Sequence, residues 1–323
     1  MTDTTQGLKP DSGLDAVRRV AAAQARVARR GLRARWGLVA PALLIIAVFG
    51  IGPLLITVVY SFLEAATYGG VIWNFSFDAY VQFLFERDIF DETLHFSWSY
   101  PQIFGRSILL ALVTTVFCVL VGFPTAYFMA TRPPSQRNLW LFLITLPFWT
   151  NLLIRTYAIF VILRDEGLVN NSLMWIGIIP EPLRIIHTDF AVCIGLMYSF
   201  LPFMVLPLYA ALEKMDFRLV EAGYDLYANR WQVLRRVVLP IAKPGLVAGC
   251  ILVFIPSIGA YVTPLLLGGG KELMIGNLIA LQFGNARNWP FGCAAALILM
   301  GMVLIALLYY VRSTGAKQGL GHG

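Results

Sequence analysis

The chain has 323 residues, of which 58% are hydrophobic and only 13% are charged, and its mean hydropathy is +0.71. These values lie far outside the range of soluble domains, so the sequence predicts an integral membrane protein. The net charge of +7 does not indicate nucleic-acid binding. The basic residues flank apolar segments instead of covering a soluble surface, and this pattern favours attraction to anionic membrane lipid.

Residues 1–35 form a basic tail that lacks the small-residue cleavage pattern of a signal peptide. Ser12 and Asp15 fit a capping box, and the arginines that follow fall near one helical face. Two interpretations stay open for this tail. It forms a cytoplasmic helix at the membrane interface, or it serves only to fix the topology.

Six apolar runs follow, each close to the roughly 20 residues that a membrane-spanning helix needs. No run alternates like a barrel strand, and hydrocarbon excludes open backbone. The expected fold is therefore all-α, a polytopic bundle of about six transmembrane helices, with an extracytoplasmic loop at 64–103 after the first helix. The expected spans are Trp36–Leu63, Ser107–Thr131, Asn138–Leu163, Phe190–Leu212, Pro244–Gly270 and Asn288–Val311.

The distribution of lysine and arginine predicts the orientation. Most of these residues fall in the tail, in the loops between spans two and three and between spans four and five, and after the last span. Because basic residues accumulate on the cytoplasmic side of short loops, both the N-terminus and the tail at 313–323 are expected in the cytoplasm. For a multi-pass protein of this kind we expect the inner (plasma) membrane of a bacterium.

The sequence contains no motif that would supply energy or catalysis. Gly268-Gly269-Gly270-Lys271 is followed by Glu272 and lacks the upstream glycine of a nucleotide-binding loop. The spans hold no acidic residue of the kind that proton-driven carriers bury. The cysteines and histidines have no ligand-like spacing, so neither a metal nor another cofactor is predicted. We expect a transport subunit rather than an enzyme, with ATP hydrolysis on a partner.

Residues 213–243, between spans four and five, combine charges and aromatics with a Leu239-Pro240 pair that is expected to break a helix. We predict that this segment docks onto another protein, with Leu226, Trp231 and Leu234 as apolar anchors. The three arginines at 230, 235 and 236 are expected to pair with acids of that protein or with lipid phosphate. The alternative is an amphipathic loop on the bilayer surface that has no partner.

Glu221-Ala222-Gly223, with Leu239-Pro240 and Pro244-Gly245 downstream, resembles the EAA loop of ABC importer permeases, which forms the coupling helix on the ATPase. Other segments are similar to permease subunits of spermidine/putrescine importers, and the resemblance covers roughly residues 36 to 312. These segments are Leu146–Arg155, Leu201–Ala210, Gly259–Pro264, Met274–Ile279 and Asn288–Pro290.

The resemblance implies a type I ABC importer permease fold, with a transmembrane core at 104–312. It also implies a second homologous permease subunit, two cytoplasmic ABC ATPase subunits and an extracytoplasmic solute-binding protein. The coupling residues that it implies are Glu221, Ala222, Gly223, Asp225, Tyr227, Arg230, Trp231, Leu234, Leu239 and Pro240.

Three positions depart from the family pattern. Gly223 replaces the second alanine of the loop, and Tyr227 occupies the position where a glycine is expected. Because tyrosine is disfavoured at positive φ, either Asn229 takes over the turn or the first short helix runs longer. Ala260 stands where some polyamine relatives carry an acid, which weakens the expectation of a cationic cargo.

The candidate pathway residues are Trp149, Asn151, Arg155, Tyr157, Tyr198 and Tyr261. The rings of Trp149, Tyr157, Tyr198 and Tyr261 suit contact with an ammonium group, although aromatics in spans more often pack against other helices or anchor at the membrane interface. Arg155 either holds helices together or lines the path, where it would repel a polyamine and attract a carboxylate.

Several breaks are expected in the spans, at Pro202 and Pro207 in the fourth and at Pro256, Gly259 and Pro264 in the fifth. Gly245 and Gly249 form a G-x-x-x-G step for close helix contact.

The function expected from these features is that of a permease subunit for a polyamine or a related small nitrogenous solute, with alternating access coupled to a separate ATPase. The alternatives are a passive channel or gradient-driven carrier, a permease for an opine-like or carboxylated amine, and a membrane scaffold without solute flux.

Overall fold

The computed structural model describes residues 39–87, 94–270 and 273–318, so the predicted basic tail at 1–35 lies outside the described residues. The chain divides into two compact units after Val59. Within the described residues five helices are long and apolar enough to cross a membrane, and a bent helix pair would make a sixth. The expectation of a helical membrane protein with about six spans is confirmed.

The first span is a helix over Val39–Ser61. It includes a π-helical turn, η1 (Ala47–Ile51), and continues as α2 (Gly52–Ser61). Pro53 lies two residues after the π turn and has no N–H to donate to the preceding turn. A wider turn beside a proline is a common way for a helix to continue past it.

The segment after the first span, expected as a loop, contains two antiparallel two-stranded sheets. β1 (Leu63–Ala65) pairs with β2 (Val71–Phe75), and the turn between them contains Gly69 and Gly70, both at positive φ. The short helix α3 (Asp78–Val81) follows, and β3 (Phe85–Arg87) then pairs with β4 (Leu94–Phe96). Stacked and edge-on aromatic rings at 62, 75, 77 and 80 hold the first sheet and α3 together.

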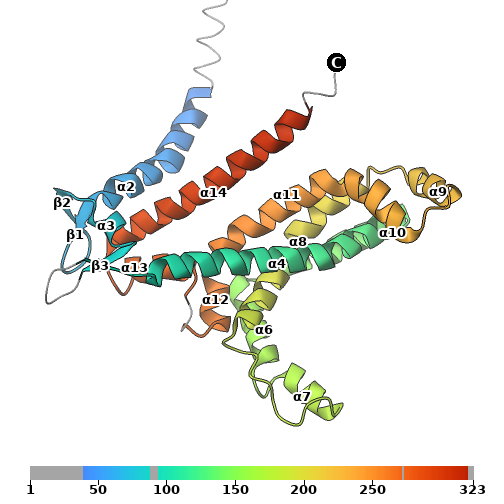
Figure 1. The fold of residues 1–323 in the computed structure, drawn as a ribbon, viewed down its shortest axis with the longest axis horizontal. Helices are drawn as coiled ribbons and strands as arrows, with labels where there is room; N and C mark the ends of the chain where they lie inside the picture. The colour runs from blue at the N-terminus through green and yellow to red at the C-terminus, as the bar shows by residue number, and fades with distance from the viewer. Residues whose placement is uncertain (1–38, 88–93, 271–272, 319–323) are drawn as a thin grey trace, which may run out of the picture. The chain divides into compact units, whose positions relative to one another are not determined.

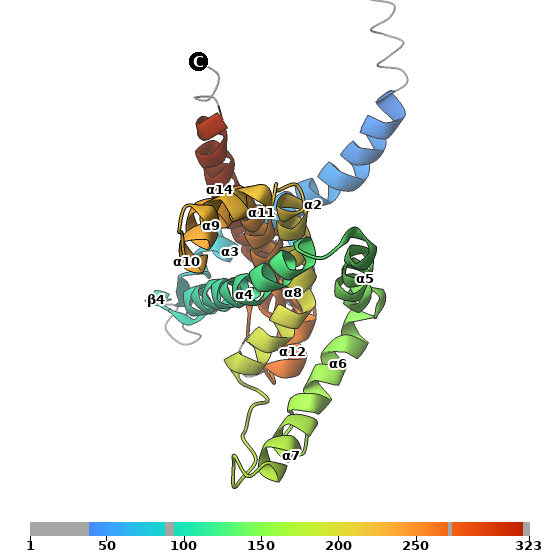
Figure 2. The same ribbon diagram turned by 90° about the vertical axis from the view of Figure 1, so that its right-hand side faces the viewer.

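Three long helices form the core of the second unit. They are α4 (Ser99–Ala130), α8 (Asp189–Leu212) and α11 (Leu239–Ile258), which pack side by side (Figures 1 and 2). Met204 of α8 is fully buried where the helices meet. A Cβ on Gly122 of α4 would lie 2.8 Å from Met204 Cγ, and one on Gly249 of α11 would lie 2.7 Å from its Sδ. Glycines on two helices therefore make the room for one methionine on the third.

The third expected span, Asn138–Leu163, is not one straight helix, and this prediction is corrected. α5 (Pro134–Thr145) runs into a 3₁₀ turn, η2 (Leu146–Trp149), and α6 (Leu152–Leu163) leaves at an angle of 94° (Figure 2). The Asn151 side chain caps α6 by accepting a hydrogen bond from Leu153 N at 2.8 Å. A cap in the middle of an apolar run starts a new helix. A shorter helix, α7 (Leu168–Trp175), follows.

The Leu239-Pro240 pair does not break the chain's helix, which corrects the expectation. α10 (Arg230–Val233), the π-helical η3 (Leu234–Val238) and α11 form one apolar helix over Arg230–Ile258. Pro240 lies two residues after the π-helical turn η3, as Pro53 lies two residues after η1. The second part of the predicted loop 213–243 is thus the beginning of the fifth span, and only its first part lies outside the long helix.

The expected breaks in spans four and five are mostly absent. α8 continues through Pro202 and Pro207, and α11 continues through Pro256. The helix does end at Gly259, as predicted, and α12 (Val262–Leu267) begins after Tyr261 with Pro264 inside it. The fifth span is therefore shorter at this end than the expected Pro244–Gly270.

The chain ends with two helices, α13 (Ile275–Phe283) and α14 (Trp289–Gln318), which pack against each other. A Cβ on Gly276 of α13 would lie 2.7 Å from the Gly259 carbonyl oxygen, so the start of α13 lies directly on the break after α11. α14 continues past the expected end of its span at Val311, into the segment that was predicted as a tail.

Candidate functional site

The predicted coupling segment is a compact turn between two helices. α9 (Arg218–Asp225) begins after Asp216, whose carboxylate accepts a hydrogen bond from Arg218 N at 3.0 Å. Val220 on α9 and Val233 on α10 are buried and hold the turn against the core. The segment lies at the end of the core where α4 ends, as Figure 1 shows.

The turn between α9 and α10 is a Schellman motif. Ala228 N donates to the Gly223 carbonyl at 3.1 Å, and Tyr227 N donates to the Tyr224 carbonyl at 2.9 Å. Such a motif places its C′ residue in the left-handed region, where glycine is usual. Here that residue is Tyr227, with φ at 57°. A left-handed conformation at a residue with a Cβ costs about 1–2 kcal/mol.

The two alternatives predicted for Tyr227 can now be compared with the turn. Asn229 caps α10 in a capping box, with Gln232 N donating to Asn229 Oδ1 at 2.8 Å and Asn229 N donating to Gln232 Oε1 at 2.9 Å. It does not take the left-handed position, because its φ is −76°. α9 also does not run on, since it ends at Asp225. Both alternatives were wrong, and Tyr227 itself makes the turn.

The turn exposes three large apolar side chains. Tyr227 is 98% exposed, Leu226 81% and Trp231 68%. Leu234, predicted as a third anchor, is instead partly buried and packs against the core. The remaining predicted coupling residues lie on the surface except Gly223, which is partly buried and faces Val233. These exposed residues are Glu221, Ala222, Asp225, Arg230, Leu239 and Pro240.

Four of the predicted pathway residues lie at or after the break in the third span. Trp149 ends η2 and is 82% exposed, and Asn151 caps α6. Tyr157 is exposed on α6, and its ring stacks on that of Phe160 with the ring centroids 5.9 Å apart. The remaining residue at this break is Arg155, in the first turn of α6.

Arg155 bridges the break itself. Its Nη1 donates to the Pro147 carbonyl at 2.9 Å, and the same carbonyl accepts the Thr150 hydroxyl at 2.8 Å. The carbonyls at the end of a helix need such donors when they have no partner in the next turn. This contact joins the two halves of the bent span, while a position of Arg155 along the path stays a prediction.

Tyr198 and Tyr261 lie elsewhere. Tyr198 is exposed on α8, and Tyr261 precedes α12, where its carbonyl accepts a hydrogen bond from Asn277 Nδ2 at 3.0 Å. In the described part of the chain, no hydrogen bond or ring contact joins either tyrosine to the group on α6. α12, which begins directly after Tyr261, nevertheless packs against α6, and a common path lined by the six residues stays a prediction.

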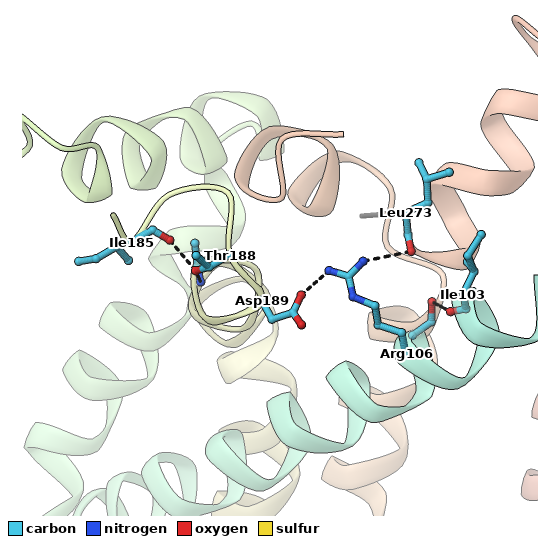
Figure 3. Close-up of polar contacts among 8 residues, drawn as sticks. Ile103, Arg106, Ile185, Thr188, Asp189 and Leu273 are labelled. Atoms are coloured by element: carbon cyan, nitrogen blue, oxygen red, sulfur yellow. Dashed lines mark hydrogen bonds and ion pairs between the residues drawn. The ribbon is translucent and has the colours of Figure 1, made fainter. Parts of the chain in front are cut away.

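Sequence reasoning missed a polar junction near the start of α4, at the other end of this helix from the coupling segment, drawn in Figure 3. Arg106 of α4 forms an ion pair with Asp189, the first residue of α8, and its Nη1 donates to the Leu273 carbonyl at 3.5 Å. The next residue, Ser107, accepts a hydrogen bond from Ile275 N at 2.9 Å and donates to the Ile103 carbonyl at 2.8 Å. We call Arg106, Ser107 and Asp189 the α4–α8 clamp.

The α4–α8 clamp joins α4 to α8 and to the start of α13. α4 begins at Ser99, eight residues before the expected span, and therefore includes Arg106. The helix can include this charged residue because Asp189 of α8 compensates its charge. Asp189 stands in the first turn of α8, where the helix dipole favours a negative charge, and Thr188 caps the same helix. The signal in the sequence was an Arg-Ser pair at the edge of one apolar run and a Thr-Asp pair at the edge of another.

We expect Arg106→Gln and Asp189→Asn each to destabilise the purified complex by about 1 kcal/mol, because the pair is partly exposed. The double variant should lose no more stability than the less stable of the two single variants, because the interaction between the two side chains can be removed only once. Thermal melting of the four proteins in detergent measures this cycle. Strictly additive losses would show that the two side chains do not act together.

The fold is a bundle of membrane helices with a surface turn between the fourth and fifth spans, and this arrangement fits the class of transport permeases. The chain matches the family of binding-protein-dependent transport system inner membrane components over residues 122–313. It belongs to this family, and it is therefore a multi-pass inner-membrane permease subunit rather than an enzyme.

Among curated proteins, the chain is 44% identical over 215 residues to the spermidine/putrescine transport system permease protein PotB of Escherichia coli, covering 67% of this chain and 78% of PotB. It is 48% identical over 212 residues to PotB of Haemophilus influenzae, covering 66% and 73%. The inner membrane ABC transporter permease protein YdcU of Escherichia coli is 32% identical over 230 residues, covering 67% and 72%.

Among solved structures, a bacterial ABC transporter involved in the import of the acidic polysaccharide alginate superposes with a TM-score of 0.61 at 17% identity. The match covers 90% of this chain and 98% of that one. At this identity the likeness concerns the fold alone, and it confirms the expected type I ABC importer permease fold.

Proposed function

We propose that the chain is a permease subunit of an ATP-driven importer for a polyamine such as spermidine or putrescine. The observation that carries this proposal is the identity of 44–48% over more than 210 residues with PotB proteins. The relative YdcU, whose name gives no substrate, is less similar at 32%. The named substrates of the PotB relatives support a polyamine over an opine-like or carboxylated amine.

The geometry of Arg155 is compatible with this cargo. An arginine that lines the path would repel a polycation, but the guanidinium here is held by the Pro147 carbonyl across the helix break. The aromatic rings of Trp149 and Tyr157 on the same segment are exposed. We propose that they face the path in the assembled importer and contact the ammonium groups through their ring faces.

The energy comes from a partner in this proposal. Leu226, Tyr227 and Trp231 dock into a cytoplasmic ATPase, one of two in the importer, and the buried contacts of Val220 and Val233 transmit its movement to the core. A second homologous permease completes the path, and an extracytoplasmic solute-binding protein delivers the cargo. The N- and C-termini lie in the cytoplasm in this arrangement.

The test is uptake by proteoliposomes that contain the two permease subunits and the ATPase, with the binding protein outside. We expect accumulation of labelled spermidine or putrescine that requires ATP on the ATPase side. Preferred uptake of a carboxylated amine would refute the choice of cargo. Polyamine flux in liposomes that lack the ATPase would instead support a channel or a gradient-driven carrier.

A further inference from the structure

A cavity of about 310 Å³ lies between the end of α4 and the coupling segment. Its walls come from the last turns of α4 and, about 100 residues later in the sequence, from the end of α9 and the continuous helix of α10 and η3. The lining residues are Phe123, Pro124, Tyr127, Tyr224, Arg230, Val233, Leu234 and Val238.

The lining combines an apolar wall with a small set of polar groups. Five of the eight residues are apolar, and the polar side-chain groups are two phenol hydroxyls, of Tyr127 and Tyr224, and the guanidinium of Arg230. The lining contains no carboxylate. A cavity with these walls fits an amphiphile that has an apolar chain and an anionic head, because the guanidinium and both hydroxyls can donate hydrogen bonds to phosphate oxygens.

Arg230 has no acidic partner among the residues that the structure describes. In the described residues no carboxylate lies within the 4.0 Å of an ion pair from its guanidinium, whereas Arg106, Arg137 and Arg164 each have one. A guanidinium beside an apolar cavity is favourably placed when an anion neutralises it. Arg230 is exposed and its charge is not paired within the described residues, so it is free to bind an anionic group from outside the chain.

The position of the cavity favours a lipid over a protein side chain. Phe123, Pro124 and Tyr127 belong to the last turns of a membrane-spanning helix, which ends at Ala130. Directly after it, the guanidinium of Arg132 lies 4.0 Å from the ring centroid of Phe128, an arrangement suited to the membrane interface. The cavity thus lies at the boundary between the apolar span and the polar surface segment. Basic pockets between helices at this level bind the head groups of anionic lipids.

We propose that this cavity binds an anionic phospholipid of the inner leaflet, with the phosphate at Arg230, Tyr127 and Tyr224 and part of an acyl chain along the apolar wall. The assignment to the inner leaflet rests on the proposed function, which places the coupling segment in the cytoplasm. A lipid bound here would contact both α4 and the coupling segment, and would thereby join the two.

The experiment is native mass spectrometry of the purified full importer, with equal amounts of phosphatidylglycerol and phosphatidylethanolamine of the same acyl chains. We expect the wild type to retain phosphatidylglycerol preferentially, and Arg230→Gln to weaken that retention about fivefold. Arg236→Gln removes the same charge from the same continuous helix, but Arg236 is outside this cavity, so retention should hardly change. Arg230→Lys should recover most of the binding because it keeps the charge.

A second variant tests the apolar wall. Leu234→Trp adds volume to the cavity lining and should reduce binding of the lipid while Arg230 is intact. Equal retention of both lipids by the wild type, or equal loss in the Arg230→Gln and Arg236→Gln variants, would overturn the proposal. So would lipid that is retained by the two permease subunits alone and displaced in the full importer, since the cavity would then receive a side chain of the ATPase. None of these outcomes depends on transport or on the cargo.

Discussion

Replacing Leu226 and Trp231 together by aspartate is expected to abolish copurification of the ATPase with the permease. The two side chains are among the most exposed apolar groups of the coupling segment, and neither is needed to hold the turn, which depends on Val220 and Val233. Apolar anchors of this kind commonly contribute 2 kcal/mol or more to an interface, so loss of both should weaken binding by about a thousandfold. The amount of ATPase bound to tagged permease measures the effect.

Tyr227→Gly gives a sharper test of the same surface. Glycine adopts the left-handed conformation without strain, so the turn itself should become more favourable by about 1 kcal/mol. If the exposed ring docks on the ATPase, binding should nevertheless decrease. A variant with a more stable turn and unchanged binding would remove Tyr227 from the interface.

The control for the double aspartate variant is Leu183→Asp. Leu183 is also exposed but lies between α7 and α8, away from the coupling segment. The substitution is the same as the one at Leu226, so membrane insertion and ATPase binding should both remain. Loss of ATPase with this variant would show that the assay reports general damage to the permease. Full binding by the double aspartate variant would contradict the proposed docking surface.

The second large effect is expected for Gly245→Ala, at the crossing of α11 and α8. A Cβ at this position would collide with the carbonyl oxygen of Pro207 and lie 2.7 Å from Ala211 Cβ. The obstacle is largely backbone, which cannot rotate away as a side chain can. Overpacking of a close-packed core costs about 1–3 kcal/mol, and we expect a clear fall in melting temperature and in the yield of assembled permease.

Gly301→Ala is the matched control for this change. Gly301 lies on α14, and a Cβ there would meet no atom within 4 Å. Alanine is the better helix former by about 1 kcal/mol, so this variant should be neutral or slightly more stable. Similar melting temperatures for the two alanine variants would mean that the contact between Gly245 and Pro207 does not limit helix packing.

The outcome for the bent third span shows where the sequence misleads. Its apolar run is long enough for one helix, and Pro147 alone did not predict the break, because α8 continues through two prolines. What distinguishes the bend is a polar closure around it, with Asn151 capping the new helix and Arg155 bonded to the Pro147 carbonyl. These bonds depend on where the chain folds back, and no local pattern specifies that.

In the coupling segment, too, the sequence indicated some features, and others depended on how the chain folds. Leu226 and Trp231 could be predicted as candidate anchors from the sequence, because large apolar residues are unusual in a charged loop, and both side chains are exposed. Leu234 was chosen on the same ground and is turned toward the core instead. The difference arises because the helix begins at Arg230 and sets which residues face α4, and that boundary follows from the capping box at Asn229.

Composition and the length of the apolar runs determined by themselves that this is a helical membrane protein, and the loop motif indicated a transport permease. Burial of apolar surface in a bilayer depends on length and hydropathy, which are properties of the sequence. Only the tertiary structure decided which charges are compensated and which glycines touch a neighbouring helix. Arg106 meets Asp189, and Gly245 meets Pro207, through contacts between residues that are far apart in the chain, and such contacts exist only once the helices have packed.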